Sequence, residues 1–283
     1  MARRLGATLA FALALVLVAG APAAAANYKT WTPFALWEVP TADLGTVSPF
    51  ETGILVKAFD PTMNIQRYLD TAQAQGDRVV VYFVNTVDYR SGTVYPSRVA
   101  SQVSKIKNHP ALYGYLSVKE PNWSGITISE MRSLYRAYRD ADPNHRVIAL
   151  LGDTPHFGTS QNPWATGVAN MLWVNWYPVS CSRGYLTGAA TNFPKVRSYV
   201  EKVTPWVPIW LMVQAHAYYR GDKCTPTNAQ LSREVREGFD YLQAEGIVFY
   251  PWNNPQADRD LKRNPTLTSH MRTIIREVRA GTF

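Results

Sequence analysis

The chain has 283 residues, a formal net charge of +8 and two cysteines. Its basic residues are scattered rather than clustered, which argues against a nucleic-acid-binding arm, and we expect no nucleic-acid partner. We interpret the excess positive charge as an ordinary solvated surface; the sharper alternative is weak attraction to an anionic cell envelope or an acidic polysaccharide.

The N-terminal segment has the pattern of a secretory signal peptide. Arg3 and Arg4 precede an apolar run at residues 5–18, and small residues end the segment. The apolar run is too short to span a bilayer comfortably. We therefore expect cleavage after Ala26, export of residues 27–283, and no membrane span in the mature protein, which we expect to be a monomer.

Eight β-rich apolar runs alternate with segments of helical periodicity. The runs are residues 33–38, 53–60, 78–85, 112–120, 146–153, 171–177, 208–216 and 247–252. Alternating strand and helix patterns predict parallel strands joined by crossover helices. Eight such units in about 250 residues are typical of a (β/α)8 TIM barrel, a fold of the α/β class. Because no linker or low-complexity segment divides residues 27–283, we expect a single domain.

The helical segments carry their own start signals. Thr127 with Glu130, and Thr227 with Gln230, have the spacing of capping boxes. Residues 41–50, between the first two runs, are short and interrupted by proline and glycine, so they are not expected to form a full helix. The first β/α unit is therefore predicted to be degenerate.

The seventh run shows how the two faces of a strand differ. Aliphatic residues at positions 209, 211 and 213 alternate with Trp210, Met212 and Gln214. We expect the aliphatic face to pack under helices and the other face to fill the barrel. That inner face becomes polar towards the C-terminal end of the strand, where TIM barrels place their active sites.

Polar and aromatic residues end nearly every predicted strand, and in a barrel they converge on one end. Trp and Tyr rings suit the apolar faces of pyranose sugars, while amide and charged groups suit the hydroxyls. We therefore expect a carbohydrate ligand. The predicted ligand-binding residues are Trp37, Lys57, Asn85, Lys119, Asn175, Tyr177, Gln214, His216 and Trp252.

Residues 109–122, His-Pro-Ala-Leu-Tyr-Gly-Tyr-Leu-Ser-Val-Lys-Glu-Pro-Asn, resemble the fourth strand of retaining glycoside-hydrolase barrels. Trp176-Tyr177-Pro178 resembles the end of their sixth strand, residues 208–214 their seventh, and residues 246–252 their eighth. The resemblance covers the barrel from the third strand onward and indicates the superfamily, not a family within it. It implies that Glu120 is the general acid/base.

The sequence departs from that resemblance at two positions. Lys119 stands where Asn or Asp usually precedes the glutamate, and Gln214 stands where retaining enzymes place a nucleophilic glutamate. An amide cannot act as that nucleophile, so a glycosidase would need a second carboxylate. Asp153 is the first candidate and Glu38 the second; their distance from Glu120 would distinguish retention from inversion.

Three functions remain open from the sequence. The leading one is a secreted glycosidase; the others are a non-catalytic barrel that binds carbohydrate or cell-wall polymer, and an interaction scaffold of the cell envelope. The five histidines form no HExxH motif and no close pair, so we expect neither a metal nor another cofactor. Because export permits oxidation, Cys181 and Cys224 are predicted to form a disulfide between the loops after the sixth and seventh strands.

Lys57 and Lys119 are unusual at the strand ends of a sugar-binding barrel. Either lysine could pair with a carboxylate of the protein, which is the favoured interpretation, because an unpaired buried ammonium is costly. The alternative is that a lysine binds an anionic group of the ligand, such as a uronate or a phosphate on a glycan.

Overall fold

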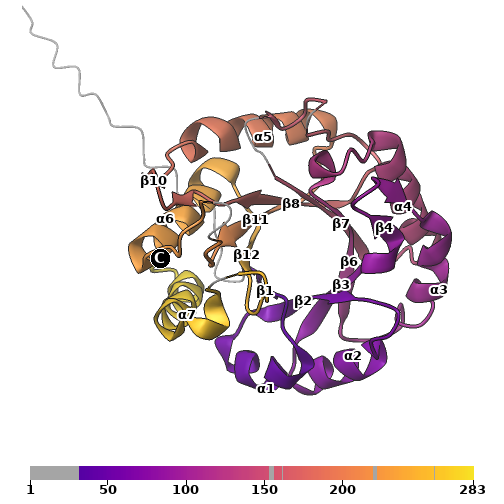
Figure 1. Ribbon diagram of the computed structural model, residues 1–283, viewed down its shortest axis with the longest axis horizontal. Helices are drawn as coiled ribbons and strands as arrows, with labels where there is room; N and C mark the ends of the chain where they lie inside the picture. The colour runs from indigo at the N-terminus through magenta and orange to yellow at the C-terminus, as the bar shows by residue number, and fades with distance from the viewer. Residues whose placement is uncertain (1–31, 153–155, 161, 219–221, 258) are drawn as a thin grey trace, which may run out of the picture.

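A computed structural model describes residues 32–152, 156–160, 162–218, 222–257 and 259–283. At its centre is a closed barrel of eight parallel strands, seen end-on in Figure 1. In barrel order they are β1 (Phe34–Trp37), β12 (Gly246–Tyr250), β11 (Ile209–Gln214), β8 (Met171–Trp176), β7 (Arg146–Leu151), β6 (Leu112–Lys119), β3 (Arg78–Phe83) and β2 (Gly53–Phe59). The eight predicted strands and the (β/α)8 TIM barrel are confirmed. The predicted signal peptide, residues 1–26, lies outside the described residues.

The first and last barrel strands close the sheet. Phe34 of β1 is in register with Gly53 of β2 on one side and with Ile247 of β12 on the other, and both pairings are parallel. Closure leaves no open sheet edge, so the C-terminal ends of all eight strands form one ring. That ring is where the predicted site residues were expected to meet.

The strands separate two apolar cores, as their alternating pattern predicted. In β11, Trp210 and Met212 belong to an inner cluster that contains residues from all eight strands. Ile209 and Leu211 of the same strand belong to the outer cluster, which packs against the helices. The inner cluster fills the barrel with Trp173 stacked on Trp210, their ring centroids 5.7 Å apart. The barrel is therefore a packed core and not a pore.

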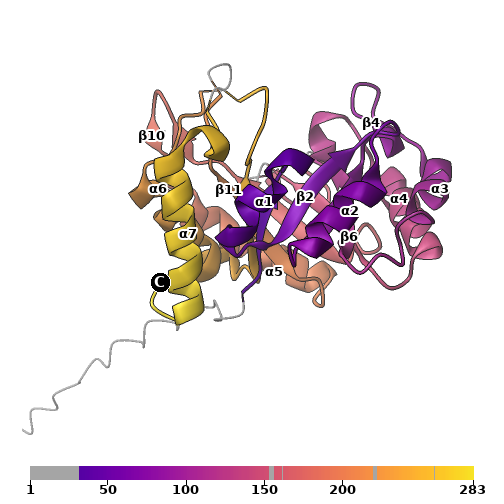
Figure 2. The same ribbon diagram turned by 90° about the horizontal axis from the view of Figure 1, so that it is seen from below.

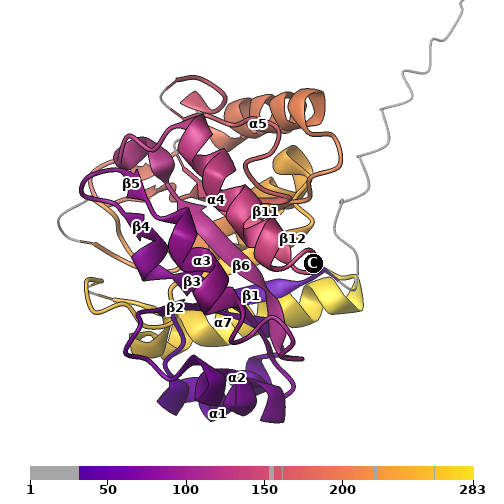
Figure 3. The ribbon, with the colours of Figure 1, turned by 90° about the vertical axis from the view of Figure 1, so that its right-hand side faces the viewer.

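Seven α-helices are described around the barrel. They are α1 (Leu44–Val47), α2 (Ile65–Ala74), α3 (Val99–Val103), α4 (Ile128–Ala141), α5 (Ala189–Val203), α6 (Asn228–Glu237) and α7 (Pro265–Ala280). Helix α3 packs beside α4, which also contacts β6 (Figure 3). Among the described helices, none is long and apolar enough to cross a membrane.

Both predicted capping boxes are present. The Thr127 hydroxyl accepts a hydrogen bond from the Glu130 N–H, and the Glu130 carboxylate accepts one from the Thr127 N–H at 2.7 Å. Thr227 and Gln230 make the equivalent pair at the start of α6. Each box satisfies N–H groups that the first helical turn would otherwise leave without partners.

The helical layer is irregular at two units. As predicted, the first unit is degenerate, because α1 has four residues and 3₁₀ turns flank it at Thr41–Asp43 and Ser48–Phe50. Between β7 and β8, the described residues 156–160 and 162–170 contain no α-helix. The sequence analysis did not anticipate this second irregularity.

Two small hairpins project from the C-terminal end of the barrel. One, β4 (Val87–Asp88) with β5 (Thr93–Val94), follows β3; the other, β9 (Val179–Ser180) with β10 (Gly184–Tyr185), follows β8. Figure 2 shows both at the same end of the barrel. They therefore flank the ring of strand ends from two directions.

Candidate functional site

Glu120 lies directly after β6, at the C-terminal end of the barrel. Its N–H donates to the Leu150 carbonyl at 2.6 Å, and its backbone is left-handed, with φ 44° and ψ 55°. The carboxylate Oε1 accepts a hydrogen bond from Asn175 Nδ2 at 2.6 Å. Two residues that are 55 positions apart in the sequence are thus brought together, one after β6 and one in β8.

Gly152 provides the space for this pair. A Cβ atom at position 152 would lie 2.4 Å from Asn175 Oδ1 and 3.3 Å from Glu120 Oε1. The first distance is far below van der Waals contact, so a side chain here would displace the Asn175 amide. The residue directly after β7 therefore has to be a glycine for Glu120 and Asn175 to keep their hydrogen bond.

Four aromatic residues, Tyr177, His216, Tyr218 and Tyr250, form what we term the aromatic side of the site. The His216 ring lies edge-on to the other three, with centroid distances of 4.9 Å to Tyr177, 4.5 Å to Tyr218 and 5.1 Å to Tyr250. Tyr177 stacks on Tyr250 at 5.7 Å. The hydroxyls of Tyr218 and Tyr250 are 3.1 Å apart, and Asn254 Nδ2 donates to both.

Burial sets the charge state of this side. It raises the pKa of Tyr177 and of Tyr250 well above the ordinary value of 10, and the negative charge of Glu120 acts in the same direction. Burial also lowers the pKa of His216 to about 4. At neutral pH the imidazole is therefore uncharged and the three tyrosines keep their hydroxyl protons; the Tyr177 hydroxyl donates to Met212 Sδ at 3.2 Å.

The opposite part of the strand-end ring, which we term the ionic side, carries Glu38, Lys57 and Lys119. Lys57 Nζ is 3.1 Å from Glu38 Oε2, so these two predicted residues neutralise each other. Lys119 Nζ lies 6.0 Å from the ring centroid of Tyr82 and 5.8 Å from that of Tyr89. Glu38, like Glu120, has a left-handed backbone, with φ 59°.

Gln214 is placed differently from the other predicted ligand-binding residues. It is fully buried at the end of β11, and its Oε1 accepts a hydrogen bond from the Val179 N–H at 2.9 Å. Its Nε2 donates to the carbonyls of Val179, His216 and Cys224, at 3.1, 3.3 and 2.7 Å. The amide is thus used to join the loops after β8 and β11.

Two further predicted residues lie apart from Glu120. Trp252 is buried against Phe50, and its Nε1 donates to Asp43 Oδ2 at 2.8 Å, in the degenerate first unit. Asn85 lines a cavity of ≈ 320 Å³ between α2 and α3, on the flank of the barrel.

Trp37 is buried in the barrel interior, with its ring edge-on to Tyr250 at 5.6 Å. Asp153 lies outside the described residues.

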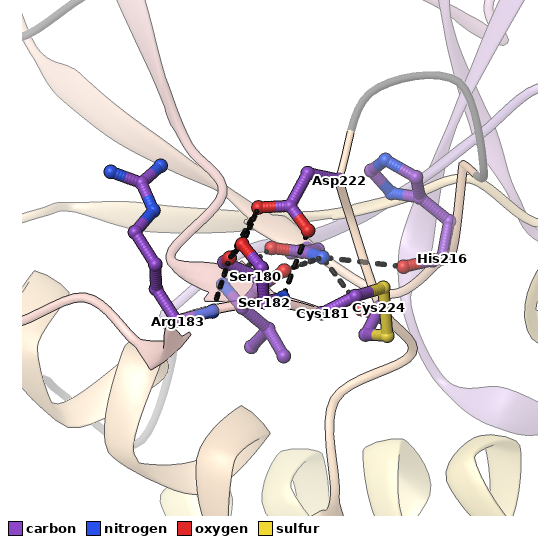
Figure 4. The surroundings of a disulfide bond; sticks show 9 residues. Ser180, Cys181, Ser182, Arg183, His216, Asp222 and Cys224 are labelled. Atoms are coloured by element: carbon purple, nitrogen blue, oxygen red, sulfur yellow. Dashed lines mark hydrogen bonds between the residues drawn. A yellow bond between two sulfur atoms is a disulfide. The ribbon is translucent and has the colours of Figure 1, made fainter.

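The predicted disulfide between Cys181 and Cys224 is present and joins the loops after the sixth and seventh barrel strands. Figure 4 shows its surroundings, where Asp222 receives hydrogen bonds from the hydroxyls of Ser180 and Ser182 at 2.5 and 2.7 Å. Those hydroxyls lower the pKa of Asp222 to about 2. The disulfide, Asp222 and the Gln214 amide thus connect the same two loops, which carry Tyr177 and Tyr218.

The residues of the site that the sequence analysis did not identify include Gly152, Tyr250 and Asn254. The alternation along the strand could have identified Tyr250, because it is two positions after Val248 and so shares the inner face of β12. Gly152 likewise follows the inner residue Leu150 by two positions. No local sequence pattern indicates that Asn254 belongs to the site, because its position depends on the course of the chain after β12.

The fold is similar to that of several solved carbohydrate-active enzymes. A β-galactosidase from the psychrophilic Marinomonas ef1 superposes with a TM-score of 0.64 at 9% identity, over 87% of this chain and 59% of that one. An endo-β-1,4-mannanase from Thermotoga petrophila gives 0.57 at 10% identity, over 90% and 77%. Saccharomyces cerevisiae Gas2p, in complex with laminaritriose and laminaritetraose, gives 0.54 at 14%, over 83% and 58%.

These similarities establish the fold alone, since every identity is low. This chain spans 59% of the length of the β-galactosidase. Neither a protein-family profile nor a curated protein matches the sequence. The chemistry of the site must therefore be argued from its own residues.

Proposed function

We propose that the chain is an exported, monomeric glycoside hydrolase that acts on an oligo- or polysaccharide, with Glu120 as the general acid/base. One observation carries the proposal. The Glu120 carboxylate is held at the C-terminal end of the barrel by Asn175, next to the stacked rings of Tyr177 and Tyr250. Enzymes of this fold carry out their chemistry at that end.

The hydrogen bond to Asn175 fixes one oxygen of Glu120 and leaves the other available. Among the residues that the structure describes, none donates to Oε2. Oε2 can therefore hold the proton that a glycosidic oxygen needs when it leaves as a hydroxyl. The uncharged tyrosines beside it would place an aromatic surface next to the sugar ring.

A hydrolase of this kind also needs a second carboxylate. Asp153 remains our first candidate, because it directly follows Gly152, which lies against Glu120. Glu38 is the second candidate, but one of its oxygens already contacts Lys57 at 3.1 Å. The second carboxylate would act as a nucleophile if it lies close to Glu120, or would activate a water if it lies further away.

The structural neighbours support a carbohydrate as the ligand. Two are named for hydrolysis of galactosides and of β-1,4-mannan, and the third is bound to laminari-oligosaccharides. For this chain we propose a glycan or cell-envelope polymer outside the cell, in keeping with the signal-peptide pattern and the disulfide. The ligand-binding residues that we propose at the site are Lys119, Asn175 and Tyr177.

A second function is favoured by Gln214. The seventh strand ends in an amide where the retaining glycosidases that the sequence resembles carry a nucleophilic glutamate, and this amide is hydrogen-bonded to loop backbones. A barrel that binds a glycan without cleaving it would keep the aromatic side and lose the chemistry. This alternative predicts tight binding with no release of reducing sugar.

A polysaccharide panel tests the proposed function. The wild-type protein, Glu120→Gln and Glu245→Gln would be compared for reducing-sugar release and for binding. Glu245 is an exposed residue near the other end of the barrel and serves as an isosteric control. We expect Glu120→Gln to lower kcat/KM by at least about 100-fold without loss of binding, because general acid catalysis typically contributes that much. Glu245→Gln should match the wild type.

The same panel separates the two functions. Hydrolysis by the wild type that depends on Glu120 supports the glycosidase. Binding by both proteins without hydrolysis by either supports the non-catalytic barrel. If no polysaccharide is bound or cleaved, both functions are wrong and the envelope scaffold becomes the leading one.

A further inference from the structure

Lys57, Lys119 and Lys223 lie near the C-terminal end of the barrel, and the first and last of them are bound by the protein itself. Lys57 Nζ is paired with Glu38 at 3.1 Å, and Lys223 Nζ donates to the Tyr177 carbonyl at 2.6 Å. Lys119 differs from both. Among the described residues no hydrogen-bond acceptor or carboxylate contacts its ammonium, and the nearest interactions are with two ring faces at 5.8 and 6.0 Å.

The backbone explains why Lys119 does not pair with its sequence neighbour. Glu120 reaches across the end of β7 to Asn175 in β8, whereas Lys119 leans the opposite way, towards Tyr82 in β3 and Tyr89 in the hairpin after it. Glu120 has a left-handed backbone, which helps to separate the two directions. The two adjacent charges therefore stand on opposite flanks of β6.

We infer that Lys119 binds the anionic group of an acidic glycan, on a sugar unit next to the one held by Glu120 and Asn175. This inference rests on the proposed function and specifies its substrate class. A glycan that crosses the end of β6 would meet Glu120 on one flank and the ammonium on the other. The sugar on the ionic side would then carry a carboxylate, as in a uronate, or a phosphate; both supply an oxyanion to the ammonium.

The surroundings of Lys119 suit such a ligand. The side chain is half-buried, so its ammonium is less hydrated than a fully exposed lysine and gains more from an oxyanion partner. The nearby Lys57 cannot take the same role without losing its contact with Glu38. Of the two lysines that the sequence offered for an anionic ligand, the geometry therefore selects Lys119.

Calorimetric titration with matched ligands tests the inference. Glu120→Gln would be the background, so that ligands are not cleaved, and Lys119→Met, Lys119→Arg and Lys202→Met would be added to it. The probes are oligogalacturonate, oligomannuronate and a glucuronate-substituted xylo-oligosaccharide, each beside its carboxyl-reduced counterpart, and a phosphorylated manno-oligosaccharide beside its dephosphorylated form. Lys202 is an exposed lysine on α5 and serves as the control.

We expect at least one acidic probe to bind more tightly than its neutral counterpart. Lys119→Met should weaken that acidic probe by about 10- to 100-fold, the range expected for a hydrogen bond to a charged group, and should leave the neutral counterpart unchanged. Lys119→Arg should restore most of the difference, and added salt should reduce it. Whether a uronate or the phosphorylated probe shows the effect identifies the oxyanion.

Each other result has a distinct meaning. If neutral probes bind as well as acidic ones, or if Lys119→Met weakens both members of a pair equally, the inference is wrong and the proposed function stands. If no probe binds any variant and the wild type cleaves no polysaccharide, the proposed function fails and the inference fails with it.

Discussion

The two sides of the barrel's C-terminal end are held in place by different means. On the aromatic side, a disulfide, the Gln214 amide and a tyrosine–asparagine network fix the loops that carry Tyr177 and Tyr218. On the ionic side, one ion pair and the rings near Lys119 are the described side-chain interactions of the three charged residues. The aromatic side therefore supplies rings in fixed positions. On the ionic side, Lys119 supplies a charge whose ammonium can still move to contact a ligand.

The largest expected effect is on the aromatic side, at Gln214. Gln214→Ala removes the hydrogen-bond partner of the Val179 N–H and of the His216 and Cys224 carbonyls, whereas the Val179 carbonyl keeps its hydrogen bond from the Cys224 N–H. Leaving those groups unsatisfied should lower the free energy of unfolding by about 3–5 kcal/mol. Guanidinium unfolding of the oxidised protein measures it, with the exposed Gln73→Ala as the control. A loss below about 1 kcal/mol would show that the loops do not depend on this amide.

The disulfide should rank next. Its cysteines are 43 residues apart, and removing both in Cys181→Ser/Cys224→Ser should lower the free energy of unfolding by about 2–4 kcal/mol. Reduction of the wild type should bring it to the same stability as the double variant. If the oxidised wild type and the double variant unfold at the same denaturant concentration, the disulfide does not support the aromatic side.

The buried imidazole of His216, on the aromatic side, should make the free energy of unfolding depend on pH. Burial lowers the pKa of His216 to about 4, below its ordinary value of 6.5, so the unfolded chain takes up this proton before the folded one. Stability should therefore fall as the pH decreases from 6.5 to 4, by up to about 3 kcal/mol from this residue. The difference in unfolding free energy between wild type and His216→Phe, measured across this window, should shrink on acidification. A constant difference would contradict the assignment.

The smallest expected effect is on the ionic side. In Lys57→Met the ion pair with Glu38 is lost, but both side chains are partly exposed, at 15% and 23%. Water can solvate the remaining carboxylate, so the free energy of unfolding should fall by at most about 1 kcal/mol. The same unfolding assay measures it. A loss as large as that of Gln214→Ala would erase the distinction between the two sides.

Much of the fold was predictable because strand alternation has a direct physical cause. Trp210 and Met212 point inward and Leu211 outward, since side chains alternate along a strand, and the apolar runs revealed this without any tertiary information. The position of Glu120 at a strand end followed from the same pattern and from the resemblance to known barrels. Its hydrogen bond to Asn175 did not, because it joins residues from two different strands.

The surroundings of Trp252 and Gln214 could not be read from the strand pattern, for one physical reason. The predicted eighth run ended at Trp252, but β12 ends at Tyr250, so Trp252 turns towards Asp43 and not towards the barrel axis. Gln214 likewise lies where inner-face alternation puts it, yet its partners Val179 and Cys224 come from loops. Loop conformations depend on long-range contacts, which the local pattern of a single sequence does not contain.

The left-handed backbone of Glu38 and Glu120, with φ 59° and 44°, has a practical consequence for protein engineering. Such angles cost a residue with a Cβ about 1 kcal/mol or more, and glycine adopts them freely. Glycine would remove this backbone cost at both positions, but it would lose the hydrogen bond from Asn175 at position 120 and the contact with Lys57 at position 38. Any clone with glycine at position 120 would lack the carboxylate, so thermal selection of this barrel has to be coupled to a screen for its activity.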